Sequence, residues 1–171
     1  MTTVSRDITP DALEREIHLA ASTDVPVLIT AQTLAGARRI ARAIHERRPD
    51  AHQQSFTVVS GDLTIDRVVT SLQKGSGAVV FEGVGAFGDD LQAVLLELLE
   101  SQAGRRAGEP RYSRILSTSL PDLYSHVEAG TFRKELFYRL NTIHINVCLP
   151  MTVGDVLVTG GVSGPRVSPP H

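Results

Sequence analysis

The sequence lacks the features that mark several classes of protein. It has one cysteine, Cys148, and no tryptophan, and only 5% of its residues are aromatic. A lone cysteine excludes a disulfide framework and a cysteine-rich zinc site, and we expect Cys148 to be a small buried apolar residue. So few aromatic side chains argue against a stacking platform for single-stranded nucleic acid.

Long apolar runs and an excess of charge of one sign are also missing. No run approaches the ~20 apolar residues that cross a bilayer, and the polar opening MTTVSRDITPDALERE is unlike a secretory signal. Seventeen basic against nineteen acidic residues give a formal net charge of −2, which does not favour nucleic-acid binding. The six histidines are scattered without an i, i+4 pair, so no metal site is expected. We therefore expect a cytoplasmic protein that binds neither membrane nor DNA directly.

The apolar residues that are present alternate between two periods. The 171 residues, 42% of them hydrophobic, suffice for one domain with its own core. Strands are predicted at 25–30, 55–60, 77–81, 113–119 and 142–147. Helices are predicted at 10–21, from Leu34 to a stop at Pro49, from Asp62 or Thr64 to Gln73, at 89–99, and in two short segments at 121–130 and 131–141. Near-continuous apolar strands between helices favour a parallel sheet covered on both faces, an α/β sandwich.

Composition also divides the chain. Residues 1–150 are predicted to form the α/β core, and 151–171, rich in glycine and proline, a flexible tail in which 153–162 could form a β-segment. Residues 102–111 read as a polar loop. Its arginines, with Arg105 and Arg106 adjacent and Arg111 nearby, are expected to be solvated, with contact to phosphate or an acidic partner as the alternative.

One stretch carries a specific signature. Residues 127–145, VEAGTFRKELFYRLNTIHI, resemble the AAA+ domain of the sigma-54-dependent transcriptional activators (bacterial enhancer-binding proteins), in which G-x-F-R-x-D/E-L-Y/F-Y-R-L-N precedes the last core strand. Ten positions fit in order: Gly130, Phe132, Arg133, Glu135, Leu136, Phe137, Tyr138, Arg139, Leu140 and Asn141. The likeness covers roughly residues 10–147. It implies a P-loop NTPase-like (AAA+) three-layer sandwich with a five-stranded, mainly parallel sheet.

The segment that resembles the family's phosphate-binding loop departs from its pattern. Glycines there let backbone N–H groups wrap the phosphates, and a lysine reaches the β and γ phosphates in the pattern G-x-x-x-x-G-K. Aligned on Gly36, the first glycine is replaced by Ala31 and the lysine by Ala37, and Leu34 adds a branched side chain. Arg38 is one residue beyond the lysine position, a step of roughly 100° around a helix, so we expect it to point elsewhere.

The other nucleotide positions implied by the resemblance are altered as well. The family's Asp-Glu pair after the third strand, which organises Mg²⁺ and polarises water, reads Glu82-Gly83 here, and the sensor I asparagine position is Leu120. Without the first loop glycine, the lysine, the second acid of the pair and the asparagine, we expect no hydrolysis machinery. We therefore predict no catalytic residues, no bound metal and no cofactor. Ser117, Thr118 and Ser119 lack a nucleophile-elbow pattern, so a hydrolase triad is not expected either.

Two arginines of the signature remain. In the family, arginines in this segment act across a subunit boundary on a neighbour's ATP, and Arg133 and Arg139 could present such a subunit edge. The alternative is that they brace their helix through salt bridges with Glu128 or Glu135.

Segments that the family uses for other contacts do not match. Residues 60–77 have room for one helix and a turn and contain no GAFTGA string, which in the family touches the sigma factor. The GAF within 84–90 falls at a different position. After residue 147 the sequence departs from the family's L-P-P-L-R-E-R, so neither a lid subdomain nor a DNA-binding helix-turn-helix is expected.

Three functional hypotheses follow from the resemblance. The first is a degenerate AAA+ pseudo-ATPase that works in transcription regulation by binding a protein, with an intact AAA+ sigma-54 activator as the expected partner. The second is an ATP-binding AAA+ regulator with a non-standard site, in which Arg38 and Glu82 restore binding of ATP and Mg²⁺. The third is a decayed gene product without activity.

Overall fold

Five parallel strands form one sheet in the order β2-β3-β4-β1-β5. The structure, a computed structural model, describes residues 9–61, 66, 69–70, 77–104 and 114–147. The strands are β1 (Val27–Ala31), β2 (Ser55–Ser60), β3 (Gly77–Glu82), β4 (Arg114–Ser119) and β5 (Ile143–Val147). The five predicted strands and the parallel sheet are confirmed. The first strand begins two residues later than predicted, directly after Pro26, which has no N–H to donate to a neighbouring strand.

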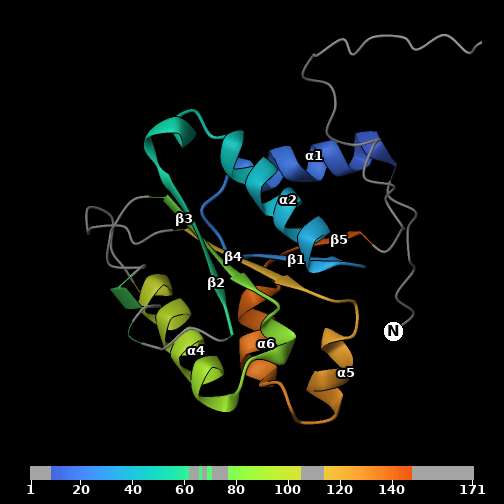
Figure 1. The fold of residues 1–171 in the computed structure, drawn as a ribbon, viewed down its shortest axis with the longest axis vertical. Coiled ribbons are helices and arrows are strands. Elements are labelled where there is room, and N and C mark those ends of the chain that lie inside the picture. Colours follow the sequence, from blue (N-terminus) through green and yellow to red (C-terminus); the bar gives the residue numbers. More distant parts are fainter. Residues whose placement is uncertain (1–8, 62–65, 67–68, 71–76, 105–113, 148–171) are drawn as a thin grey trace, which may run out of the picture.

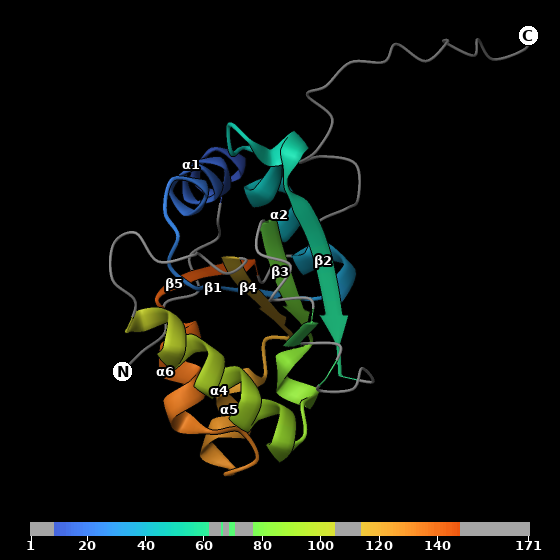
Figure 2. The same cartoon turned by 90° about the vertical axis from the view of Figure 1, so that its left-hand side faces the viewer.

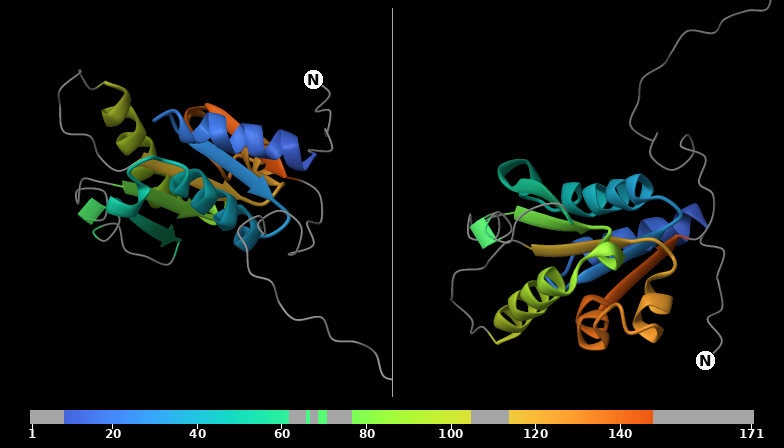
Figure 3. Two further views of the ribbon diagram at one scale, coloured as in Figure 1. Left: turned by 90° about the horizontal axis from the view of Figure 1, so that it is seen from above. Right: turned by 60° about the horizontal axis from the view of Figure 1, so that its bottom comes forward.

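Helices cover both faces of the sheet, as Figures 1 and 3 show. On one face lie α1 (Pro10–Ala21) and α2 (Leu34–Glu46), and on the other α4 (Asp89–Ala103), α5 (Leu123–Glu128) and α6 (Lys134–Leu140). Short 3₁₀ turns follow α2 (Ala51–Gln53) and β3 (Val84–Ala86). Of the helix predicted from Asp62 or Thr64 to Gln73, the described residues Asp66, Val69 and Thr70 are helical. The turned view in Figure 2 shows the same layers from the side.

Alternation along each strand divides the core in two. In β1, Val27, Ile29 and Ala31 pack with α1 and α2, whereas Leu28 packs with the helices of the opposite face. The apolar residues of the signature belong to this second core, because Phe132, Leu136 and Leu140 are at most 2% exposed. Successive side chains of a strand point to opposite faces, so the apolar runs read from the sequence supply both cores at once.

Some expectations fall outside the described residues. These are the location of Cys148, the arginine-containing loop at 105–111, the tail at 151–171 and most of the segment between β2 and β3. Among the described residues, no helix combines the length and the apolar composition that a bilayer crossing requires.

Candidate nucleotide site at the carboxyl ends of the strands

The sheet order brings the predicted site positions to one edge. β4 lies between β3 and β1, and all three strands run parallel, so their carboxyl ends are neighbours. Ala31 is the last residue of β1, Glu82 is the last of β3, and Leu120 follows the last residue of β4. Open α/β sheets bind ligands in the crevice outside this edge. The positions that the resemblance implies therefore lie together at this edge, and what they can bind depends on which side chains stand there.

The turn after β1 is short and is closed by its own residues. Only Gln32 and Thr33 separate β1 from α2. The Thr33 hydroxyl accepts a hydrogen bond from the Gly36 N–H at 3.0 Å, and the Thr33 carbonyl accepts one from the Ala37 N–H at 3.1 Å. Ala37 itself is fully buried. A capping threonine thus satisfies the N–H of Gly36, which a phosphate-binding loop would turn towards phosphate.

Leu34 and Gly83 meet above this turn. Gly83 has a φ of +69°, the left-handed region that favours glycine, and a Cβ added to it would lie 3.1 Å from Leu34 Cδ1. Its N–H donates a hydrogen bond to the buried Thr118 hydroxyl at 3.2 Å. A glutamate at position 83 would therefore combine backbone strain with crowding against Leu34.

Arg38 does not point away from the site, and that expectation was wrong. Its guanidinium forms a two-pronged ion pair with Glu82, with Nε to Oε1 and Nη2 to Oε2 both 2.5 Å. The Glu82 side chain is 10% exposed and that of Arg38 47%. The hydrogen bonds and charge of Glu82 raise the pKa of Arg38. The arginine side chain is long enough to reach Glu82 although its Cα lies one residue, a rotation of roughly 100°, beyond the lysine position.

A magnesium–nucleotide complex needs a lysine, a metal-binding hydroxyl and an available acid. Among the described residues at these positions, the lysine is replaced by Ala37, the hydroxyl by Arg38, and the acid Glu82 is paired with that arginine. These residues do not fit the group. Within the same part of the chain, no three histidine, cysteine, aspartate or glutamate side chains come together in a way that could hold a metal ion.

The two arginines of the signature are held by α4. Arg133 donates to both carboxylate oxygens of Asp89, at 3.0 and 2.8 Å, and Arg139 lies 3.5 Å from Glu100. The braces predicted with Glu128 or Glu135 are thus not the ones found. The reason is that α6 packs along α4, which places carboxylates from a distant part of the sequence beside these guanidinium groups. Both arginines stay about half exposed, at 41% and 46%.

A buried glutamine joins α4 to the segment before α6. Gln92, 2% exposed, donates from Nε2 to the carbonyls of Phe87 (2.8 Å) and Thr131 (3.0 Å), and its Oε1 accepts the Arg133 N–H (2.8 Å). Gly130, in the left-handed conformation, ends α5 and lets the chain turn into this contact. The signature thus includes, besides two charged side chains, the corner where the segment before α6 is hydrogen-bonded to Gln92 of α4.

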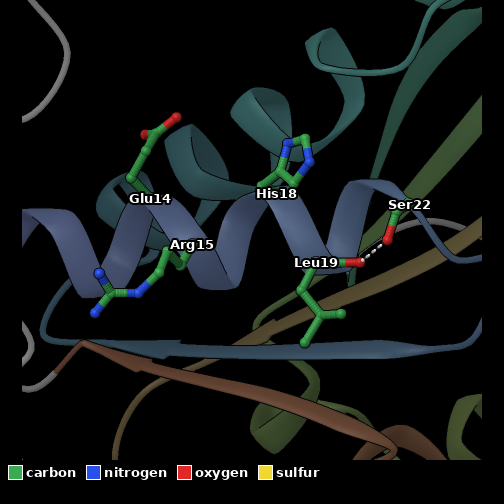
Figure 4. A pocket seen from close by; sticks show the side chains of 5 residues that line it. All are labelled: Glu14, Arg15, His18, Leu19 and Ser22. Carbon is green, nitrogen blue, oxygen red and sulfur yellow. Dashed lines mark hydrogen bonds between the residues drawn. The ribbon is translucent and has the colours of Figure 1, made fainter.

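The remaining candidates offer no exposed polar group at the strand ends. Ser117, Thr118 and Ser119 are buried in β4. Leu120 is 40% exposed and offers no polar group. A separate hollow lies on the outer side of α1 (Figure 4), lined by Glu14, Arg15, His18, Leu19 and Ser22, away from the carboxyl ends of the strands.

The contacts that Thr33, Asp89, Gln92 and Thr118 make were not predicted from the sequence. Thr33 has a local signal, because a threonine before a helical pattern is a capping residue. Gln92 and Thr118 make contacts with partners far away in the sequence, and no local pattern predicts those.

Comparison with known proteins identifies a family and several relatives of this chain. The sequence matches the sigma-54 interaction domain family over residues 5–149. It is 30% identical over 159 residues to the anaerobic nitric oxide reductase transcription regulator NorR of Shigella sonnei, and equally to NorR of Escherichia coli O1:K1, covering 79% of this chain and 32% of each relative. The chain thus spans about a third of the length of the curated relatives it matches.

Solved structures share the fold. NtrX from Brucella abortus, in complex with ADP, gives a TM-score of 0.66 at 26% identity, covering 81% of this chain and 36% of NtrX. The P-loop NTPase domain of the sigma-54 transport activator from E. coli gives a TM-score of 0.55 at 21% identity, covering 78% of this chain and 98% of that domain. The second likeness is one of fold alone.

Proposed function

This chain belongs to the sigma-54 interaction domain family of AAA+ proteins, and we propose that it acts in transcription regulation through protein contacts, as a pseudo-ATPase. The observation that carries the proposal is which residues stand at the carboxyl ends of the strands. Ala37 stands at the lysine position, Thr33 caps the turn, and Glu82 is paired with Arg38. A phosphate-binding loop gains its affinity from backbone N–H groups and a lysine charge. Here the lysine is absent, and the Gly36 N–H is hydrogen-bonded to Thr33.

The expected partner is an intact AAA+ sigma-54 activator. Support comes from the edge formed by α4 and α6, where Arg133 and Arg139 remain half exposed although carboxylates hold them in place. Fixed, solvent-facing ion pairs give an interface specificity and register. On this proposal the chain would join or cap an assembly of the partner and change that partner's ATPase rate.

A second candidate is an ATP-binding regulator with a non-standard site, and one observation favours it. Arg38 lies at the site rather than away from it. The pair with Glu82, however, offsets the positive charge that would attract phosphate and occupies the acid that would bind Mg²⁺. We therefore rank this candidate second.

Mixing experiments test the first proposal. The chain is added to an intact activator from the same organism, and complex formation and ATPase rate are followed by sedimentation and phosphate release. We expect the chain alone to be inactive, a joint complex to form, and the activator's rate to change at least twofold. The variant Arg139→Glu should weaken the complex at least tenfold, whereas the control Arg15→Glu on the outer side of α1 should not. A chain that stays monomeric and leaves the rate unchanged at tens of micromolar would contradict the proposal.

A further inference from the structure

Arg38 and Glu82 occupy two positions that bind the same metal ion in the family's sequence pattern. The inference drawn from their pairing rests on the function proposed above. In the pattern G-x-x-x-x-G-K-[ST], the final hydroxyl binds Mg²⁺, and the acid that ends the third strand binds the same ion. Counting from Gly36, that hydroxyl position is Arg38, and the strand-end acid is Glu82. The two positions that would share a metal ion are therefore the two that form the ion pair.

We propose that the Arg38 guanidinium replaces the divalent cation, as a positive charge covalently built into the site. Each carboxylate oxygen of Glu82 receives one N–H, with both distances 2.5 Å. A planar guanidinium matches a carboxylate in this two-pronged way, so it saturates the acid as a metal would. Because the Glu82 side chain is only 10% exposed, it needs a positive partner in the folded state.

The replacement also changes how the site is linked. A bound metal and nucleotide would connect α2 to β3 only while present. Here the connection between Arg38 on α2 and Glu82 on β3 is made by side chains of the protein itself. Leu34 packs beside Gly83 at the same place, so the strand end is closed by one ionic and one apolar contact. The core then has no need of a cation for its stability.

Paramagnetic broadening tests the proposal, with Mn²⁺ as a probe in place of Mg²⁺. In the full chain labelled with ¹⁵N, Arg38→Thr removes the built-in charge and restores a hydroxyl. We expect the Glu82 and Gly83 amide signals of this variant to broaden at a Mn²⁺ concentration at least tenfold lower than in the wild type. The matched control Arg39→Thr changes the next, exposed arginine of α2 and should behave as the wild type does. Adding Glu82→Gln to Arg38→Thr should abolish the effect.

Stability supplies a second readout. In metal-free buffer, Arg38→Thr should lower the Tm by about 3–6 °C, because it strips the partner from a nearly buried acid. Should that variant fail to fold, the wild type still decides the matter. Its Arg38 Nε–H signal should not change in up to 10 mM MgCl₂, and displacement of that signal by Mg²⁺ would overturn the proposal.

Two results separate the inference from the proposed function. If the wild type broadens at Glu82 at the same Mn²⁺ concentrations as Arg38→Thr, the built-in cation is refuted while the pseudo-ATPase stands. If the wild type alone hydrolyses ATP in a Mg²⁺-dependent way, the proposed function fails, and the inference fails with it.

Discussion

At the scale of single residues, burial rather than charge sets the behaviour of His45. This side chain of α2 is 5% exposed and packs at a tilt against Phe56, with ring centroids 5.4 Å apart and an interplanar angle of 49°. Burial lowers the pKa of His45, since removal from water disfavours the charged imidazolium. The unfolded chain therefore binds a proton at His45 more readily than the folded chain does.

His45 makes stability depend on pH. The pKa of His45 in the folded chain lies below the unfolded value near 6.5. The free energy of unfolding therefore falls as the pH drops from about 6.5 to the folded pKa. The loss is at most about 1.4 kcal/mol per pH unit. Urea unfolding of His45→Phe between pH 5 and 8 should show a flatter dependence than the wild type. His52→Gln, at an exposed imidazole, is the control. Equal slopes for His45→Phe and wild type would refute the assignment.

Among the helices and strands, the start of α2 shows how a turn can be closed by its own residues. The Thr33 hydroxyl takes the N–H of Gly36. Losing such a cap costs about 1 kcal/mol. We expect Thr33→Ala to lower the free energy of unfolding by that amount and Thr33→Ser to restore most of it. Chemical denaturation of the three proteins is the measurement, and an unchanged midpoint for Thr33→Ala would argue against the cap.

The corner between α4 and α6 depends on Gln92. Replacing it by leucine keeps the volume but strands the Arg133 N–H and the carbonyls of Phe87 and Thr131. Buried groups left without partners cost about 2–4 kcal/mol in total here. Gln92→Leu should destabilise the chain by that amount in urea unfolding, whereas Ser101→Ala, on the exposed end of α4, should change little. A loss below about 0.5 kcal/mol for Gln92→Leu would show that the corner is held otherwise.

At the scale of the whole molecule, the layered sheet follows from the sequence while the site's contacts do not. Apolar runs such as 77–81 and the leucine stripe of 89–99 predict strands and helices through their periods. The signature at 127–145 then supplies the family and, with it, the sheet architecture that periodicity alone leaves open. Fold and family were therefore within reach of the sequence.

The contacts of individual charged side chains could not be predicted from the sequence. Arg38 meets Glu82 across 44 positions of sequence, and Arg133 meets Asp89 across another 44. Such pairs depend on how α2 sits against β3 and α6 against α4, and helical rotation or local spacing carries no information about that. This is why the direction of Arg38 and the partners of Arg133 and Arg139 were predicted wrongly.

We propose that this chain keeps the AAA+ fold but has lost the nucleotide affinity that the family's phosphate-binding loop confers. The most direct measurement is an NMR titration of the full chain with ATP and MgCl₂, up to several millimolar, followed at the amides of Gly36, Glu82 and Gly83. We predict that these signals stay in place and that no phosphate is released. Saturable shifts at Gly36 with a Kd below about 100 μM, accompanied by turnover that requires Mg²⁺, would contradict the claim.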